Sequence, residues 1–571
     1  MFIKLSALLG LIFISLLAGF GSVKAADTSR KFGKFEIPKA NLGSFKFPSP
    51  TDKGFLDVHP DHGSKMYYNY FEAESGANRT TPIVLWLQGG PGCSSFFGMF
   101  YINGPYFVNS DLTLSKNLGS WNRIFGLLYI EQPIGVGFSK TGTKRIPSDE
   151  VEVARDLYLA LQLFYKQNPE FAMRPLIIAG ESYAGKYVPS ISHFIVQAAM
   201  ESNGSVGQLK RRRNIGKVEP PVFPFGGMAI GNGFTDAETQ TMYQAEVAYS
   251  FGLIDRRQRL VAESMQYHTL DLVLSENYAQ ARAASDALLA YINGVSGTAT
   301  LEDVRRNLGY DGWYNVDAYL NQPEVQEFLG VLDENVTWSS CAPEVDRALR
   351  HDVMRSVKKL VADIIKFHPA LFYQGQFDGE CGVASNDAWL DSMQWEGHSG
   401  FRNADRRFWL VNDRIAGFWK QYKSLSHVMI RNAGHMVPHD NPLLGQVLIE
   451  KWITERVQRE QYQRHTSPAA EAQMIAVIDT DVGEHACCQP IPKPPPSIKE
   501  EQEVVGDGVR NGLNTEHKVV RKSKEQILER IQSSGFGSES DIKAMERFFA
   551  EIEKAAPRDE ELKKMRFEEE L

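Results

Sequence analysis

The chain has 571 residues, of which 43% are hydrophobic and 23% charged, enough to bury one large core or two ordinary ones. Its net charge of -8 and isoelectric point near 6.0 give no general support for nucleic-acid binding. Beyond the N-terminal segment, no stretch is long and apolar enough to predict a membrane-spanning helix.

The first 26 residues have the pattern of a secretory signal peptide. Lys4 supplies the positive start, residues 5–20 the apolar stretch, and Val23-Lys24-Ala25 the small-residue cleavage site. An uncleaved anchor is the alternative, but the apolar run is shorter than the roughly 20 residues of a spanning helix. We therefore expect a protein of the secretory pathway with no stable membrane insertion after signal removal.

Entry into that pathway makes the Asn-x-Ser/Thr triplets meaningful. Asn78, Asn203 and Asn335 each begin such a triplet and are predicted glycosylation sites on exposed loops. The cluster 210–213, Lys-Arg-Arg-Arg, is either a solvated charge cluster or a site of cleavage after basic residues.

Short apolar, β-branched runs predict buried parallel strands, and apolar residues at helical spacing predict the helices between them. The predicted strands are 83–88, 126–131, 175–179, 222–230, a run from 371 and a run from 428. The predicted helices are 149–167, 183–200, 356–367 and 442–456. A polar segment precedes residue 83. Between about 235 and 340 helical patterns dominate, for example 272–292, which predicts a helical lid inserted into the core.

Residues 180–185 read Gly-Glu-Ser-Tyr-Ala-Gly and follow a predicted strand. This approximates the Gly-x-Ser-x-Gly nucleophile elbow, with Ala184 in the last glycine position. A serine between small residues is common, so the motif alone is a weak signal. A serine nucleophile also needs a histidine base and a carboxylate that orients it.

Asp378 and His435 each follow a predicted strand, in the order serine, acid, histidine that doubly wound hydrolases use. An aspartate in a glycine-rich loop is more often a turn former, and a lone histidine is more often structural. Their positions nevertheless favour a catalytic triad with Ser182. The expected fold is an α/β hydrolase, with a mostly parallel sheet and helices on both faces.

Residues 89–92, Gly-Gly-Pro-Gly, follow the strand 83–88 and have side chains too small to shield their backbone amides. Such a loop can direct N–H groups at a developing oxyanion. A phosphate-binding loop is the competing interpretation, but no Gly-Lys-Ser/Thr follows.

Four motifs, at 89–95, 180–189, 231–233 and 433–438, resemble the serine carboxypeptidase family in sequence and in order. The acid loop 373–378, Tyr-Gln-Gly-Gln-Phe-Asp, is particularly similar to that of the vitellogenic-like carboxypeptidases. The resemblance extends from about residue 47 to 456 and leaves the tail uncovered.

The resemblance implies an oxyanion hole made by the amides of Gly90 and Tyr183. It also implies that Trp86, Gln88 and Glu181 bind the substrate's terminal carboxylate, with Glu181 protonated. Burial and the incoming anion would both raise the pKa of such a glutamate, which predicts activity at acidic pH.

Two departures from the family pattern concern this carboxylate site. Gln88 replaces the usual asparagine, as in the vitellogenic-like members. Ile102 aligns with the glutamate that normally shares a proton with the position of Glu181. Either Glu181 stays neutral through desolvation alone, or recognition of the carboxylate has changed. The replacement of an aspartate by Gln376 in the acid loop leaves Asp378 in place.

The resemblance further implies a disulfide between Cys93 and Cys341. Cys381 then resembles the free cysteine that some members carry after the catalytic aspartate, or is a buried and unreactive thiol. Cys487 and Cys488 lie in the tail, and their spacing assigns no partner.

The predicted protein is a secreted or vacuolar/lysosomal serine carboxypeptidase that acts on the C-terminus of peptides or proteins and needs no metal or organic cofactor. The alternatives are an acyltransferase or esterase with the same triad, and a glycoprotein that binds a partner without turnover. The sequence indicates no oligomeric state.

The expected domains are the signal peptide, the hydrolase domain 27–457, a proline-rich linker 458–497 and a charged tail 498–571 with helical patterns at 523–533 and 540–556. Three interpretations of the tail are open: a partner-binding helical hairpin, a removable extension, or an error in the prediction of the protein sequence.

Overall fold

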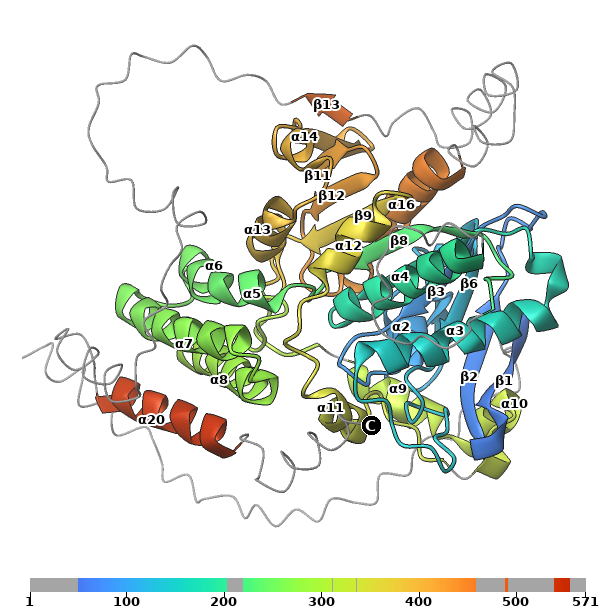
Figure 1. The fold of residues 1–571 in the computed structure, drawn as a ribbon, viewed down its shortest axis with the longest axis horizontal. Coiled ribbons are helices and arrows are strands. Elements are labelled where there is room, and N and C mark those ends of the chain that lie inside the picture. Colours follow the sequence, from blue (N-terminus) through green and yellow to red (C-terminus); the bar gives the residue numbers. More distant parts are fainter. Residues whose placement is uncertain are drawn as a thin grey trace, which may run out of the picture. The chain divides into compact units, whose positions relative to one another are not determined.

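The computed structural model describes residues 50–202, 219–310, 312–334, 336–458, 488–490 and 539–554 (Figure 1). Several predictions concern residues outside these ranges. They are the signal peptide, the glycosylation sites Asn203 and Asn335, the basic cluster 210–213 and the helix 523–533.

A sheet of eleven strands forms the centre of the described fold, in the order β1-β2-β6-β3-β7-β8-β9-β12-β11-β10-β13, and β4 and β5 form a separate hairpin. The strands are β1 Asp52–His59, β2 Ser64–Phe71, β3 Ile83–Leu87, β4 Tyr106–Val108, β5 Leu114–Lys116, β6 Gly126–Ile130, β7 Leu176–Glu181, β8 Phe225–Gly231, β9 Ala370–Gly375, β10 Arg407–Val411, β11 Arg414–Tyr422, β12 Leu425–Ile430 and β13 Cys488–Pro490. The six strands from β6 to β12 are parallel, whereas the outer strands pair antiparallel.

The parallel strands confirm the predicted ones to within a few residues. Every residue of β3, β6, β7, β9 and β12 is buried. β3 and β6 accordingly read as unbroken apolar runs, whereas β12 contains Ser426 and His427 and begins three residues before the predicted run from 428. β8 begins three residues later than predicted, at Phe225, because the preceding Pro220, Pro221 and Pro224 have no amide hydrogen to give a sheet.

The outer strands were not predicted. The sequence indicated only a polar segment before residue 83, where β1 and β2 lie, and no strand at the positions of β10 and β11. β1 has a mixed burial pattern, and β11 has both exposed and buried positions, so neither forms a continuous apolar run. β2 was detectable from its aromatic residues Tyr67, Tyr68 and Tyr70, which favour strands.

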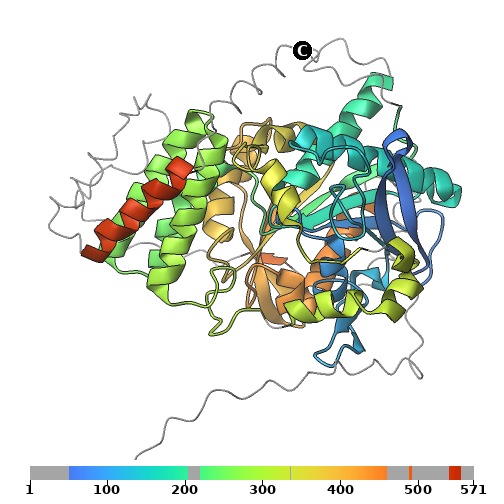
Figure 2. The ribbon, with the colours of Figure 1, turned by 90° about the horizontal axis from the view of Figure 1, so that it is seen from below.

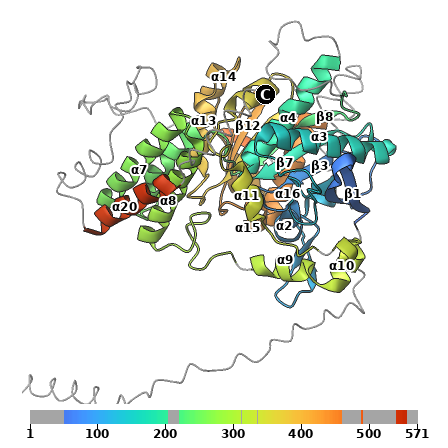
Figure 3. The same ribbon diagram turned by 60° about the horizontal axis from the view of Figure 1, so that its bottom comes forward.

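The helices are α2 Ser95–Tyr101, α3 Glu150–Gln167, α4 Ala184–Ser202, α5 Ala237–Gln240, α6 Gln244–Ser250, α7 Arg256–Leu274, α8 Tyr278–Ser296, α9 Trp313–Leu320, α10 Pro323–Leu329, α11 Pro343–Leu349, α12 Lys358–Ile364, α13 Val383–Ser392, α14 His398–Arg402, α15 Val437–Asp440, α16 Pro442–Trp452 and α20 Glu539–Lys554. Figure 3 shows α3 and α4 over one face of the sheet and α2 and α16 over the other. Asp149 caps α3 by accepting a hydrogen bond from the amide of Glu152, and this fixes the predicted start of that helix.

The helices α5 to α10 lie between β8 and β9 in the chain and form the helical insertion that the sequence predicted between about 235 and 340. The pattern at 272–292 spans two helices, because α7 ends at Leu274 and α8 begins at Tyr278. Glu276 has a φ of 60° in the turn between them. α6, α7 and α8 share an apolar core of their own with α20 (Figure 2).

Candidate active site

Ser182 lies in the sharp turn between the end of β7 and the start of α4, where a nucleophile elbow is expected. Its φ is 64°, a left-handed conformation that is rare for a residue with a side chain, and it is only partly buried. The turn depends on a close approach at Gly185, where a Cβ atom would lie 2.6 Å from the amide nitrogen of Phe234. The usual elbow pattern has its last glycine at the position of Ala184, whereas this turn requires glycine at the next position, Gly185.

Asp378 and His435 follow β9 and β12, which are adjacent parallel strands, so the fold brings the two side chains together. Nδ1 of His435 lies 2.8 Å from Oδ2 of Asp378, and the imidazole donates because a carboxylate can only accept. Oδ1 of Asp378 accepts from the amides of Glu380 and Cys381, at 2.8 and 3.1 Å. The carboxylate is therefore fixed in orientation before substrate arrives.

Ser182 and His435 are both described by the structure, and no hydrogen bond joins the hydroxyl of Ser182 to the imidazole of His435. Catalytic hydrogen bonds are often long in unliganded enzymes and shorten in the complex with substrate. The structure thus joins two of the three predicted triad residues by a direct contact and presents the third at the elbow.

Asn232 is a site residue that the sequence analysis did not identify, although its motif 231–233 was noted. Its side-chain amide donates to Oδ2 of Asp378 over 2.6 Å, and its Oδ1 accepts from the amide of Gly375 over 3.1 Å. The φ of Asn232 is 45°, a conformation that asparagine tolerates better than most residues. An asparagine between two glycines directly after a strand was the available signal.

The two amides that the family resemblance assigns to an oxyanion hole lie in adjacent loops. A Cβ atom on Gly89, next to Gly90, would be 2.6 Å from the amide nitrogen of Tyr183. Within the described residues, the amides of Gly90 and Tyr183 donate no intramolecular hydrogen bond. Gly90 is exposed and Tyr183 is buried, and both amides are available to an acceptor on a ligand.

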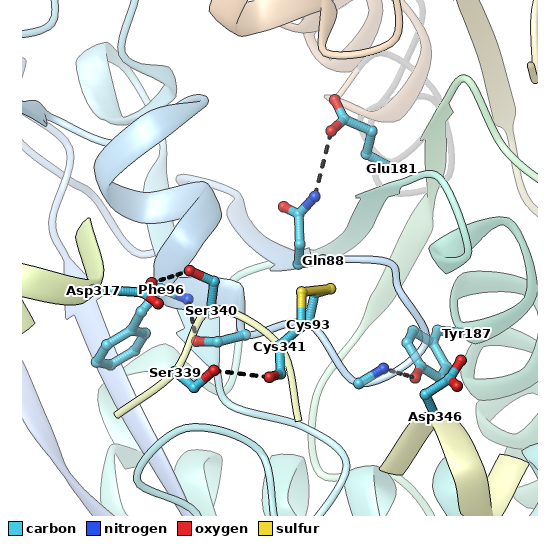
Figure 4. Close-up of a disulfide and its surroundings, with 12 residues drawn as sticks. Gln88, Cys93, Phe96, Glu181, Tyr187, Asp317, Ser339, Ser340, Cys341 and Asp346 are labelled. Carbon is cyan, nitrogen blue, oxygen red and sulfur yellow. Dashed lines mark hydrogen bonds between the residues drawn. A yellow bond between two sulfur atoms is a disulfide. The ribbon is translucent and has the colours of Figure 1, made fainter. Parts of the chain in front are cut away.

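A chain of hydrogen bonds links the predicted carboxylate-binding residues. Nε1 of Trp86 donates to Oε1 of Gln88 over 3.1 Å. Nε2 of Gln88 donates to Oε1 of Glu181 over 3.4 Å (Figure 4). Trp86 and Glu181 are fully buried. Oε2 of Glu181 has no hydrogen-bond partner among the described residues, so one carboxyl oxygen remains free to meet a ligand.

Burial raises the pKa of Glu181 to about 8, and the nearby charge of His435 and the contact with Gln88 offset this only in part. The desolvation of a single carboxyl group thus favours the protonated form of Glu181. Ile102, at the C-terminal end of α2, is itself fully buried and offers no proton to share.

His435 is buried, which would lower its pKa, but the charge and hydrogen bond of Asp378 outweigh burial and raise the pKa well above its ordinary value. Glu302 and Glu181 contribute to the same increase. The pKa of Glu302 is itself raised by burial. When these two glutamates are protonated, their contribution disappears and His435 becomes easier to deprotonate, as a general base requires.

A disulfide joins Cys93, after the glycine loop, to Cys341, before α11, as the family resemblance implied (Figure 4). The amide of Ala342 donates to the carbonyl of Gly92 and the amide of Ser94 to the carbonyl of Ser340, both over 2.8 Å. The disulfide and these hydrogen bonds tether the glycine loop to the segment that follows the lid helices.

Glu131 is a second residue that sequence analysis overlooked, at the end of β6. Its Oε1 accepts from the hydroxyl of Ser94 over 2.6 Å and from Nε1 of Trp338 over 2.7 Å, and its Oε2 accepts from the amide of Phe138 over 2.6 Å. Burial nevertheless raises the pKa of Glu131 to about 7. Glu131 therefore anchors the start of α2, because it binds Ser94, the N-cap residue of that helix and the neighbour of Cys93.

Cys381 is a free and buried cysteine, and burial raises the pKa of its thiol well above the ordinary value. Both properties favour the interpretation of Cys381 as an unreactive thiol.

A cavity of about 470 Å³ is lined in part by Asp378, but neither Ser182 nor Glu181 lines it. Its lining includes Phe251 of the lid, Gln376, Asp378 and the β12 residues His427 and Met429.

Residues 42–455 match the serine carboxypeptidase family. The chain is a member of this family. Serine carboxypeptidase-like 50 of Arabidopsis thaliana is 41% identical over 409 residues, which are 71% of this chain and 87% of the relative. The probable serine carboxypeptidase CPVL of Homo sapiens is 32% identical over 412 residues, 70% of this chain and 82% of the relative.

Among solved structures, this serine carboxypeptidase resembles Kex1(Δ)P, a prohormone-processing carboxypeptidase from Saccharomyces cerevisiae. The TM-score is 0.62 at 23% identity, and the match covers 72% of this chain and 94% of the yeast chain. The likeness confirms the expected α/β-hydrolase fold.

Asn78 is exposed, as a glycosylation acceptor must be, and its Oδ1 accepts hydrogen bonds from the amide and the hydroxyl of Thr80. None of the described helices has both the length and the apolar character needed to cross a bilayer.

Proposed function

We propose that this family member hydrolyses the C-terminal peptide bond of peptides and proteins at acidic pH, with Ser182, His435 and Asp378 as its catalytic triad. The observation that carries the proposal is the position of a buried Glu181, whose pKa burial raises to about 8, directly before Ser182 and at the end of a hydrogen-bonded chain from Trp86. A site for a terminal carboxylate thus adjoins the nucleophile.

In the first half of the reaction, the Ser182 oxygen attacks the carbonyl carbon of the last peptide bond while His435 takes the hydroxyl proton. The amides of Gly90 and Tyr183 bind the oxyanion, which typically contributes about a hundredfold to a thousandfold in rate per donor. His435 then gives its proton to the leaving amine, the C–N bond breaks, and an ester remains on Ser182.

In the second half, water attacks the ester. His435 removes a proton from the water and returns it to Ser182 as the ester bond breaks. Asp378 keeps the imidazole oriented throughout and stabilises its cationic form, and Asn232 holds the carboxylate oxygen that His435 contacts.

Recognition of the substrate's C-terminus follows from the protonation of Glu181. A protonated carboxyl can donate to the substrate carboxylate, whereas an ionised one would repel it. Burial provides this protonation without a second glutamate at position 102, so the family's proton-sharing pair is dispensable here. An acidic compartment of the secretory pathway would favour the same state, in agreement with the signal-peptide pattern.

The test compares matched blocked dipeptides that differ only in having a free or an amidated C-terminus, from about pH 4 to about pH 8. We expect release of the last residue from the free form at acidic pH, and no release by the Ser182→Ala variant. Covalent labelling by a fluorophosphonate reports whether Ser182 is a reactive nucleophile, independently of any peptide substrate.

No release from either peptide, with Ser182 still labelled, would contradict the peptidase proposal and favour acyl transfer or ester hydrolysis. Absence of both release and labelling would favour a binding protein. Labelling that persists in Ser182→Ala would mean that another residue is the nucleophile.

A further inference from the structure

Eighty residues, 459–538, lie between Gln458 and the helix α20, Glu539–Lys554, yet the apolar face of α20 is buried on the lid. Met545, Phe548, Phe549 and Ile552, at helical spacing, are at most 5% exposed. The opposite side, with Glu546 and Arg547, is exposed. Figures 2 and 3 show α20 lying along α7 and α8.

The receiving surface is built from small and flexible apolar residues of two neighbouring helices. α7 contributes Ala262 and Met265, and α8 contributes Ala284 and Leu288, all buried in the same core as α20. Small side chains of this kind let a third helix approach closely. The ring of His268 on α7 contacts Phe548 and Phe549, with ring centroids 5.6 and 5.2 Å apart.

The same core reaches the two loops that carry Asp378 and His435. Leu301 belongs to it, and the carbonyl of Leu301 accepts from the amide of Gly379 over 2.8 Å. The carbonyl of the next residue, Glu302, accepts from the amide of His435 over 2.7 Å. The segment after α8 is thus hydrogen-bonded to both loops at once.

A further backbone hydrogen bond joins the segment after α8 to the loop that carries Asp378. The amide of Val304 donates to the carbonyl of Phe377 over 3.1 Å, and a Cβ atom on Gly379 would lie 2.9 Å from Cγ1 of Val304. The loop after α8 cannot move far from its place without breaking backbone hydrogen bonds next to Asp378 and His435.

We propose that the α7–α8 face is a docking surface for an amphipathic helix, that α20 occupies it as a detachable last helix of the lid, and that docked α20 holds Leu301 and Glu302 against the loops of Asp378 and His435. The activity of the enzyme then depends on a helix that lies outside the family's matched region, 42–455. The inference rests on the proposed function for its effect on catalysis, whereas docking itself is independent of it.

Two features make α20 detachable. A helix of 16 residues with one apolar face has little stability alone in water and acquires most of it from packing. In addition, the described buried residues of α20 belong to the lid's core, and none of them belongs to the central core of the sheet. Its release would therefore expose the lid surface while leaving the sheet intact.

The experiment uses full-length protein with Phe548→Asp, which places a charge in the interface, and Arg547→Asp as a matched control one residue away on the exposed side. Amide hydrogen exchange of 256–274 and 278–296 reports docking. We expect exchange there to accelerate at least about tenfold in Phe548→Asp, with kcat/KM reduced, and neither to change in Arg547→Asp.

A synthetic peptide with the sequence of residues 539–554 supplies the rescue, because Phe548→Asp leaves the α7–α8 surface unaltered. Added to that variant, the peptide should restore both protection from exchange and kcat/KM, and the same peptide with Phe548→Asp should restore neither. Restoration in trans separates a docking surface from a general loss of folding.

Unchanged exchange in Phe548→Asp would overturn the docking surface. Accelerated exchange with unchanged kcat/KM and unchanged fluorophosphonate labelling would overturn the link to the catalytic loops. If the wild-type protein released no C-terminal residue, the proposed function would fail, while exchange and the labelling of Ser182 would still decide the role of α20.

Discussion

Asn232 donates a hydrogen bond from its side-chain amide to Oδ2 of Asp378 over 2.6 Å, the same oxygen that accepts from His435. One residue thus holds the acid of the proposed triad in line with the histidine. Asn232 comes from the loop after β8, next to β9 in the sheet, so the contact depends on the parallel pairing of these strands.

Replacing Asn232 by glycine should lower kcat/KM, with little change in the melting temperature. Hydrogen bonds to charged groups contribute about 1.5–3 kcal/mol, so we expect kcat/KM of Asn232→Gly to fall by about tenfold to a hundredfold. Glycine keeps the left-handed backbone, whereas Asn232→Ala adds strain at the φ of 45° and should also lower the melting temperature. Steady-state kinetics and thermal unfolding measure the two effects. Wild-type kcat/KM in Asn232→Gly would exclude a positioning role.

Glu181→Gln should extend peptidase activity to higher pH. The pKa of Glu181 is raised to about 8, so the wild-type carboxyl is a donor below that pH and an anion above it. Glutamine donates at every pH, and its variant should lose the alkaline decline in kcat/KM for peptides with a free C-terminus. The pH dependence of fluorophosphonate labelling, which reports the triad without a substrate carboxylate, is the control. Coincident pH profiles for variant and wild type would remove Glu181 from the carboxylate site.

Glu150 should make the protein more stable in acid than at neutral pH. Its carboxyl group is fully buried, and burial outweighs the lowering effects of Lys186, Tyr183 and Ser190 and raises its pKa from 4.5 to about 8. A raised acid pKa means that the folded state holds the proton more tightly. The resulting stabilisation is complete below pH 4.5 and is lost as the pH rises through about 8.

Glu150→Gln removes this titration, so the decrease in melting temperature between about pH 5 and about pH 8 should shrink by at least about 2 °C. Exposed Glu170, changed to glutamine, serves as the control and should leave the decrease as it is. An equal decrease in Glu150→Gln and wild type would show that Glu150 is not the group responsible.

Removing the disulfide should weaken both the fold and the oxyanion loop. Cys93 and Cys341 are 248 residues apart, and loss of a native disulfide costs about 2–5 kcal/mol in the free energy of unfolding. The double change Cys93→Ala and Cys341→Ala should also lower kcat more than it raises KM, because Gly90 loses a tether. Denaturant unfolding and kinetics test this, with Cys381→Ala as the control that keeps the disulfide. Equal stability of the two variants would contradict the prediction.

The central part of the fold was predictable from the sequence because its strands are buried on both faces. Such strands are unbroken apolar runs, and β3 and β6 were located to within one residue. The elbow serine and the order of Ser182, Asp378 and His435 were predictable for a related reason: in a parallel sheet the loops after the strands all lie at the carboxyl ends of the strands, so residues in these loops face the same side of the sheet.

The edge strands, the break between α7 and α8 and the docking of α20 were not predictable in the same way. β1 and β11 mix exposed and buried positions, and the turn at Glu276 interrupts a helical pattern that continues through it in sequence. The apolar face of α20 was visible in the sequence, but its partner surface lies more than 240 residues earlier in the chain.

The sequence by itself determined which side chains are proposed to do the chemistry, since a nucleophile, a base and an acid are defined by residue type and by their place after a strand. Only the tertiary structure decided their surroundings: that burial raises the pKa of Glu181 without a partner glutamate, that Asn232 donates to Asp378, and that Glu302 raises the pKa of His435. The reason is physical. A pKa and a hydrogen bond depend on distance and on desolvation, which are set by residues far apart in the chain.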